Sequence, residues 1–147
     1  MGKMTLADCL CYLTGKVFRK MLSCYGPYIK EKNLTVSQLF VLLALYEKDG
    51  LSAQELSVKL ALNSSTLTGI LDRLEYKGFI RRELNANDRR SIVIRLTDKA
   101  KEMKQELWDI YEKVNGYLLS SLAQEELKNL HEIMGKLESR ADEMHGK

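Results

Sequence analysis

The fold is decided by residues 64–96, which read SSTLTGILDRLEYKGFIRRELNANDRRSIVIRL. In the first half of this stretch apolar residues recur three or four positions apart, which is the spacing of one helix face. These apolar positions are Leu67, Ile70, Leu71 and Leu74. Asn63 or Ser64 can cap the start of such a helix, and Gly78 is suited to end it. We therefore expect an amphipathic helix that begins near residue 64 and stops at Gly78.

After Gly78 the apolar period changes from that of a helix to that of a strand. Residues 79–84 and 91–96 predict two strands, and residues 85–88 predict the turn between them. In the second strand three apolar residues are expected on one face, alternating with Val93 and Arg95; they are Ile92, Ile94 and Leu96. The hairpin is basic, and its arginines are Arg81, Arg82, Arg89 and Arg90.

Two further helices are predicted before this stretch. Thr35 and Gln38 have the spacing of a capping box, and Asp49-Gly50 provides a turn that ends the helix they begin. Ser52 and Glu55 form a second capping box at the start of a shorter helix. A tight turn joins this shorter helix to the helix over residues 64–77, and the hairpin follows directly. This order predicts a winged helix-turn-helix.

Long amphipathic helices are predicted at both ends of the chain. The first has an apolar stripe at Leu6, Leu10, Leu13, Val17, Met21 and Tyr25. Thr5 and Asp8 have the spacing of its capping box, and Gly26-Pro27 is expected to kink or end it. Thr97-Asp98 opens a long helix after the hairpin, and Ser121 with Gln124 opens the last one.

The apolar seams of these terminal helices are too long for the core of one small domain. We expect them to pack with one another and with a second copy of the chain, which predicts a homodimer. The predicted fold class is mainly α with a small sheet. Residues 34–97 form its DNA-binding lobe, and residues 1–33 and 98–147 form its dimerisation lobe.

The helix over residues 64–77 carries groups suited to the major groove of DNA. The side opposite its apolar face presents Ser64, Ser65, Thr68, Gly69, Asp72 and Arg73. Small residues let the backbone approach a base pair, while hydroxyls and an arginine reach base edges or phosphates. Arginines at the hairpin tip suit the narrow minor groove, and Asp88 can hold one of them extended. An ordinary polar helix face and a solvated charged turn remain the alternatives.

Composition narrows the class of protein. The chain has 147 residues, of which 45% are hydrophobic and 29% charged, which is typical of a globular protein. Its net charge of +3 is small, but residues 72–101 hold nine Lys/Arg against five Asp/Glu, a net of +4. Residues 102–147 hold six against ten, a net of −4. The positive charge is therefore concentrated around the hairpin, where nucleic-acid binding is predicted.

Other features predict a cytoplasmic protein without enzymatic activity. No apolar run approaches the length that crosses a bilayer, so no membrane partner is expected. The three cysteines are an odd number, which suits free thiols in a reducing compartment. The sequence contains no glycine-rich phosphate loop, nucleophile elbow or CxxC motif. Its two histidines, His131 and His145, are expected at the surface, so neither a metal nor a cofactor is predicted.

These motifs resemble the MarR family of bacterial winged-helix regulators. The most specific part runs from Leu62 through the predicted helix and hairpin to Lys99, and the Asp88-x-Arg90 pattern is its strongest element. The resemblance implies that Arg90 enters the minor groove and that Asp88 holds it, with Arg89 beside them. It also implies that five residues lie at or near the major groove, namely Ser64, Ser65, Thr66, Thr68 and Arg73.

The resemblance also implies a mode of regulation. Family members are dimers, often repressors that a small ligand or oxidation releases from DNA. The chain is similar to thiol-based peroxide sensors of the OhrR type, in which tyrosines position a reactive cysteine. Cys11 lies at that cysteine's place and Tyr25 at that of one tyrosine, but Gly15 replaces the second tyrosine. Cys9 is a competing candidate, and the alternative is that the cysteines only fill an interface.

The sequence thus predicts a sequence-specific regulator that binds a pseudo-palindromic operator in double-stranded DNA as a homodimer. The predicted regulator is a repressor, and its inducer is a small molecule or an oxidant. The alternative is a winged-helix module that binds another protein and not DNA.

Overall fold

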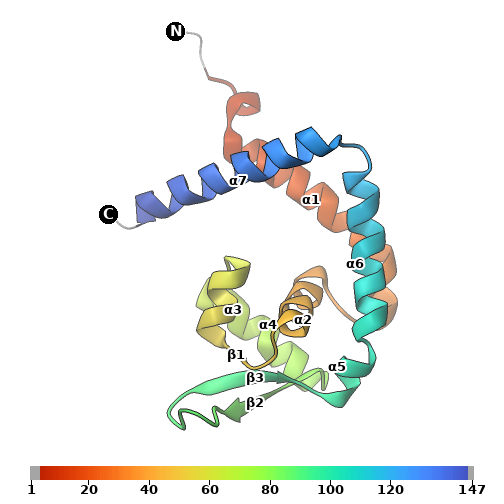
Figure 1. Ribbon diagram of the computed structural model, residues 1–147, viewed down its shortest axis with the longest axis vertical. Helices are drawn as coiled ribbons and strands as arrows, with labels where there is room; N and C mark the ends of the chain where they lie inside the picture. Colours follow the sequence, from red (N-terminus) through yellow and green to blue (C-terminus); the bar gives the residue numbers. More distant parts are fainter. Residues whose placement is uncertain (1–3, 146–147) are drawn as a thin grey trace. The chain divides into compact units, whose positions relative to one another are not determined.

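A computed structural model describes residues 4–145 of the chain, which divide after Glu112 into two compact units. The chain is mostly helical with one small antiparallel sheet, and the predicted winged helix-turn-helix lies in the first unit (Figure 1). This confirms the predicted fold class. Among the described residues, no helix is both long and apolar enough to span a lipid bilayer.

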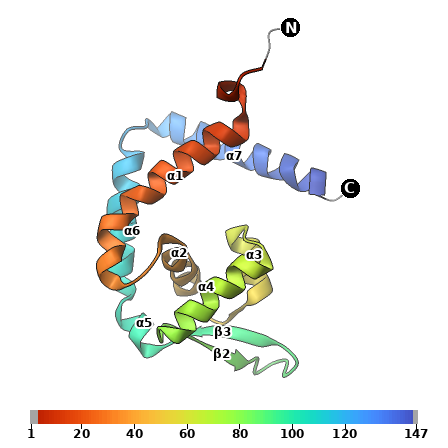
Figure 2. The ribbon, with the colours of Figure 1, turned by 180° about the vertical axis from the view of Figure 1, so that it is seen from behind.

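The winged helix-turn-helix consists of three helices on one side of the sheet (Figure 2). These are α2 (Val36–Glu47), α3 (Ala53–Leu60) and α4 (Ser64–Tyr76). Thr35 and Ser52 cap α2 and α3 through the predicted capping boxes, and Asn63 caps α4. The core between helices and sheet is aliphatic, and its fully buried members include Leu39, Leu42, Leu56, Leu67, Leu71, Leu74 and Ile94. Burial of these side chains is what holds α4 against the sheet.

The sheet has one strand more than the sequence predicted. Its strands are β1 (Leu51–Ser52), β2 (Ile80–Leu84) and β3 (Ile92–Leu96), in the order β1-β3-β2 and all antiparallel. Since β1 has only two residues, it shows no alternation that a pattern could detect. It makes β3 the central strand of the sheet.

The predicted alternation along β3 is partly wrong. Val93 is buried at 6% exposure, whereas Ile92, predicted on the same face as Ile94, is 53% exposed. Val93 pairs with Ser52 of β1, so it lies inside the three-stranded part of the sheet. Ile92 pairs with Leu84 at the end of the hairpin nearest the tip, where Leu84 is exposed as well.

The N-terminal helix differs from the prediction at both ends. The predicted capping box begins a short 3-10 helix (Leu6–Asp8) and not α1. In this box the Asp8 carboxylate accepts the Thr5 N–H at 2.8 Å. Helix α1 (Leu10–Ile29) follows and passes through Gly26-Pro27 without ending there. Pro27 lies in the last turn, so it removes a single backbone hydrogen bond, and the buried residues Tyr25 and Ile29 hold that turn in place.

The helix predicted after the hairpin is interrupted. It consists of α5 (Asp98–Glu102) and α6 (Lys104–Leu119), with Met103 capping the end of α5. At this point the Met103 N–H donates to the Lys99 carbonyl at a long 3.4 Å. The apolar spacing continues across Met103, so the pattern alone could not reveal the break.

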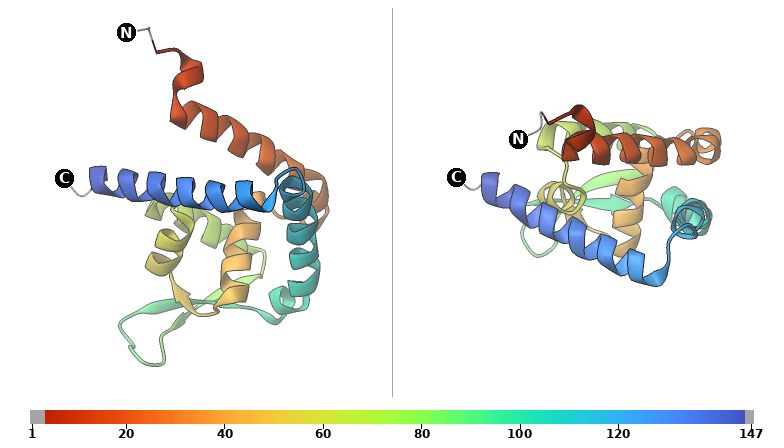
Figure 3. Two further views of the ribbon diagram at one scale, coloured as in Figure 1. Left: turned by 45° about the horizontal axis from the view of Figure 1, so that its top comes forward. Right: turned by 90° about the horizontal axis from the view of Figure 1, so that it is seen from above.

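The second unit contains the end of α6 and the long helix α7 (Gln124–His145), which is unbroken (Figure 3). The predicted capping box of Ser121 and Gln124 does not form. Instead the Glu126 carboxylate accepts the Ala123 N–H at 2.8 Å, and Ser121 Oγ donates to the Leu118 carbonyl at 2.9 Å. A glutamate three residues after Ala123 therefore serves the role that the sequence assigned to the pair Ser121 and Gln124.

Candidate nucleic-acid interface

Helix α4 presents a polar face made of small side chains. All of its predicted contact residues are exposed, namely Ser64, Ser65, Thr66, Thr68 and Arg73. The Asn63 side chain organises the first turn: its Oδ1 accepts the Thr66 N–H at 2.8 Å and the Ser65 hydroxyl at 2.9 Å. Thr68 donates its hydroxyl to the Ser64 carbonyl at 2.8 Å. The hydroxyl oxygens keep their acceptor capacity, so this face can pair with donors on base edges.

The middle of this face is an exposed stretch of helix backbone at Gly69. A Cβ atom placed on Gly69 would meet no atom within 4 Å, so packing within the protein does not require a glycine there. Glycine costs a helix interior about 1 kcal/mol relative to alanine. The glycine leaves the backbone of this helix face open to close approach by a ligand.

The tip of the β2–β3 hairpin is a structured turn. The Asn85 N–H donates to the Ser91 carbonyl at 2.9 Å, and the Ser91 N–H donates to the Asp88 carbonyl at 3.0 Å. Asp88 Oδ1 accepts the backbone N–H of Arg90 at 3.0 Å. Asp88 therefore orients Arg90 through the backbone N–H of Arg90, whereas the sequence predicted that Asp88 holds the side chain of Arg90. The guanidinium groups of Arg89 and Arg90 are exposed.

The arginines within the strands are neutralised by carboxylates of the same chain. Arg81 is paired with Glu83, and Arg82 is paired with Asp72 and Glu75 of α4. Arg95 lies 3.7 Å from Asp49 and 3.8 Å from Glu83. These ion pairs set Arg81 and Arg82 apart from the arginines at the tip of the predicted basic hairpin.

The free positive charge of the site lies on three side chains. Within residues 4–145, Arg73, Arg89 and Arg90 take part in no ion pair. One lies on α4 and two at the tip of the hairpin. This leaves a cationic site that joins a hydroxyl-bearing helix to a basic loop, a combination suited to a phosphate backbone and its grooves.

The network of Arg82, Asp72 and Glu75 was not found from the sequence. Burial lowers the pKa of Arg82, but hydrogen bonds to Asp72 and Glu75 outweigh burial and raise its pKa above the ordinary value. The signal in the sequence was the pair of acidic residues three positions apart on α4, one turn of a helix. The arginine that meets them lies on the next element, so spacing along the helix alone did not identify it.

The candidate sensing residues lie on α1 and are far apart. Cys9 caps α1 and is half-buried, and Cys11 in its first turn is exposed. Tyr25 lies fourteen residues further along the same helix, which places it roughly 21 Å away at the helical rise. One chain therefore does not bring Cys11 and Tyr25 together.

Tyr25 belongs to the core of the first unit. Its ring packs edge-on against Phe40 with centroids 5.6 Å apart. Burial, followed by the neighbouring Tyr111 and Cys24, raises the pKa of Tyr25. Its phenol therefore stays protonated at neutral pH and can act as a hydrogen-bond donor.

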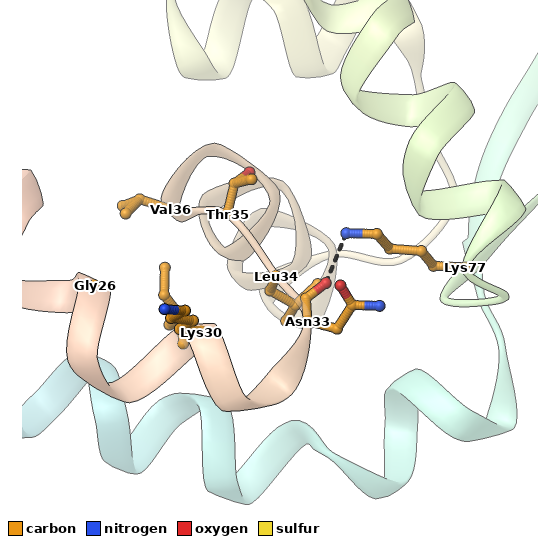
Figure 4. Close-up of a pocket in the computed structure, with 8 residues that line it drawn as sticks. Gly26, Lys30, Asn33, Leu34, Thr35, Val36 and Lys77 are labelled. Atoms are coloured by element: carbon orange, nitrogen blue, oxygen red, sulfur yellow. Dashed lines mark hydrogen bonds between the residues drawn. The ribbon is translucent and has the colours of Figure 1, made fainter.

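A cavity of about 510 Å³ lies where α1 ends and α2 begins (Figure 4). Its lining combines apolar residues with two lysines, Lys30 and Lys77. Lys77 caps the end of α4, and its Nζ donates to the Asn33 carbonyl at 2.6 Å and to Gln38 Oε1 at 3.1 Å. The sequence did not predict this cavity, because Lys77 reaches it from a distant part of the chain, while the other lining residues lie within residues 26–36.

The fold and this site define a winged-helix DNA-binding protein. Residues 34–92 match the model of the MarR family. The organic hydroperoxide resistance transcriptional regulator of Bacillus subtilis (strain 168) is 35% identical over 127 residues, which cover 86% of this chain and 85% of that protein. The chain belongs to the MarR family, and it is a DNA-binding transcriptional regulator.

Two other similar proteins agree with this assignment. The HTH-type transcriptional regulator MgrA of Staphylococcus aureus is 32% identical over 139 residues, which cover 94% of this chain and 93% of that protein. A crystal structure of a MarR mutant from E. coli complexed with operator DNA has a TM-score of 0.77 and 25% identity, covering 87% of this chain and 92% of that chain. These relatives favour the DNA-binding function over the alternative of a protein-interaction module.

Proposed function

We propose that this protein is a repressor, and not an enzyme, that binds a pseudo-palindromic operator as a homodimer in the cytoplasm. In this proposal Ser64, Ser65, Thr66, Thr68 and Arg73 lie at or near the major groove, and Asp88, Arg89 and Arg90 form the wing tip at the minor groove. The observation that carries it is the selective pairing of charges. Carboxylates neutralise the arginines of the strands, while those of α4 and the wing tip stay free.

A homodimer is supported by the apolar surface of the terminal helices. In α1 the exposed apolar side chains include Leu10, Leu13, Val17, Phe18 and Met21. In α7 they include Leu130, Ile133 and Met134. Such stripes are stable in water only when another surface covers them. We assign residues 1–33 and 98–147 to dimerisation and residues 34–97 to DNA binding.

A dimer also explains how short contacts produce affinity. Two-fold symmetry sets two copies of α4 in successive major grooves about 34 Å apart, so one operator binds both. Because one dimer contacts both half-sites, its affinity for the whole operator exceeds its affinity for a single half-site.

Two signals remain open for the release of DNA. The first is oxidation of Cys11 or Cys9, which is supported by the exposure of Cys11 and by the similarity to a hydroperoxide-resistance regulator. In such a dimer, Tyr25 of one copy can meet Cys11 only of the other, because within one chain they are too far apart.

The second signal is a small ligand in the cavity at the start of α2. The cavity has a volume of about 510 Å³ and is wide open to solvent, so a ligand there lies at the surface of the protein. Two lysines on an apolar lining suit an organic anion, such as an aromatic carboxylate. Because Lys77 caps the end of α4, an anion that draws its ammonium away from Asn33 and Gln38 changes how the end of α4 is held.

Binding to the duplex DNA upstream of the protein's own gene tests the proposal. We expect tight binding that falls steeply as salt rises from about 50 to 200 mM, with a scrambled duplex bound much more weakly. Equal affinity for both duplexes, or affinity independent of salt, would contradict a sequence-specific regulator.

The same assay separates the two signals. If the thiol is the sensor, hydroperoxide releases the DNA from the wild type but not from Cys11→Ser or, failing that, from Cys9→Ser. If the cavity is the sensor, benzoate releases the DNA from the wild type and from both serine variants, but not from Lys30→Met. Release by neither agent would contradict both signals.

A further inference from the structure

The side of α4 that faces DNA in the proposed function carries two carboxylates toward the C-terminal end of the helix. Asp72 lies next to Arg73 on this side, and its side chain is 60% exposed. Glu75, one turn later, is 39% exposed. Carboxylates this close to a phosphate backbone repel it, and burial of unpaired charge at an interface is costly. A helix with these residues approaches DNA only if the charge of both carboxylates is compensated.

Arg82 on the neighbouring strand β2 pairs with both carboxylates. Arg82 Nη2 donates to Asp72 Oδ1 at 2.6 Å, and Nη1 donates to Glu75 Oε2. The backbone N–H of Arg82 also donates to Glu75 Oε1 at 3.1 Å. The guanidinium thus spans both carboxylates, and its side chain is only 29% exposed. A free cation reaching for phosphate would extend from the surface, as the neighbouring tip arginines do.

Its place in the sheet gives Arg82 a second role. Arg82 is in register with Ile94 of β3, the strand that returns from the wing tip. Its contacts therefore join the recognition helix to the hairpin that carries Arg89 and Arg90. Fixing two separate contact surfaces relative to each other reduces the cost of ordering them on DNA.

We infer that Arg82 is a positioning residue that neutralises Asp72 and Glu75, and thereby admits α4 to DNA without touching DNA itself. This inference rests on the proposed function, in which α4 enters the major groove. Loss of Arg82 leaves two uncompensated carboxylates facing the phosphates and loosens the hairpin from the helix.

The test is a double-mutant cycle of Arg82→Met and Asp72→Asn, read as affinity for the duplex upstream of the protein's own gene. We expect R82M to bind about tenfold more weakly than the wild type. D72N alone binds severalfold more tightly, because it removes one of the two carboxylates that Arg82 compensates and leaves part of the Arg82 charge free to attract the phosphates. In the D72N background, R82M costs much less than in the wild type, because the charge that Arg82 neutralised is gone.

Arg81→Met is the matched control, since it removes the same charge from the same strand while Glu83 keeps Arg95 as a partner at 3.8 Å, and we expect it to change affinity little. Thermal unfolding verifies that each variant is folded. If R82M does not fold, D72N alone decides: tighter binding than the wild type supports the inference, and unchanged or weaker binding overturns it. An Arg82 that contacts phosphate directly would give an equal or larger loss in the D72N background, and that result overturns the inference. A wild type that binds no duplex overturns the proposed function and this inference together, whereas an equal loss in both backgrounds overturns the inference alone.

Discussion

At the wing tip, one carboxylate oxygen decides how Arg90 is presented. Asp88 Oδ1 accepts the Arg90 backbone N–H at 3.0 Å, which fixes the direction in which the chain leaves the turn. The guanidinium is left exposed and free of ion pairs within the described residues. The contact needs an acceptor atom at this position and does not need a negative charge.

Asp88→Ala should therefore weaken operator binding, whereas Asp88→Asn should not. Alanine loses the acceptor, at a cost of about 1 kcal/mol, and frees the tip to adopt other conformations. Asparagine keeps an oxygen in the same place. Fluorescence anisotropy with labelled duplex measures both variants. If D88N binds as weakly as D88A, the charge of Asp88 matters and the backbone contact does not explain its role.

Individual contact residues could be predicted from the sequence, but their partners could not. The exposed face of α4 and the tip position of Arg89 and Arg90 follow from local periodicity, because helix faces and turns are set by near neighbours. The pairing of Arg82 with Asp72 depends on how β2 packs against α4. No spacing along the chain encodes that contact, so the sequence could not separate the paired arginines of the strands from the free arginines of the tip.

Among the elements, α4 combines a stable inner face with an outer face that gives up stability. Leu67, Leu71 and Leu74 are buried, but Gly69 on the outer side has no neighbour that requires a glycine. An alanine would fit at position 69 and would make the helix more stable than the glycine does. In the proposed function α4 enters a DNA groove, and a glycine lets its backbone fit closely there.

Gly69→Ala should stabilise the fold by about 1 kcal/mol and still weaken DNA binding. The added methyl group improves helix propensity but holds the backbone away from the groove floor. Gly135→Ala in α7 is the control for helix propensity, since Gly135 is also helical with no atom within 4 Å of an added Cβ, and sedimentation velocity verifies that this variant keeps the oligomeric state of the wild type. Thermal unfolding and the binding assay measure both effects. A G69A protein that binds DNA as well as G135A would show that α4 does not approach DNA closely at this point.

Elements with long patterns were predicted well, and short or interrupted ones were not. Helices α2, α3 and α4 begin at the predicted caps because a side-chain cap acts over three residues. Strand β1 has two residues, too few for a period, and the break at Met103 leaves the apolar spacing intact. At Pro27, tertiary packing of Tyr25 and Ile29 outweighs the local signal to end a helix.

For the whole molecule, the proposal requires a second copy. Leu13 of α1 is 43% exposed and Val17 is 55% exposed. A charge placed in this stripe would be buried without a partner in a dimer, which costs several kcal/mol.

Leu13→Glu should therefore shift the protein to a monomer and lower its affinity for operator DNA. Sedimentation velocity measures the oligomeric state, and the binding assay measures the consequence. Tyr76→Glu is the control for oligomeric state, because Tyr76 is 94% exposed at the end of α4, outside the terminal helices. A wild type that sediments as a monomer, or an L13E variant that stays dimeric, would be evidence against dimerisation through this face of α1.

The most direct measurement compares Arg90→Ala with Arg81→Ala for binding to the upstream duplex at one salt concentration. Both variants lose one positive charge from the same hairpin, but only Arg90 is free, since Glu83 already pairs with Arg81. The account predicts that R90A loses about 1–3 kcal/mol of binding free energy while R81A stays close to the wild type. Equal losses in the two variants would mean that net charge alone drives binding, and would contradict a wing tip that reads DNA.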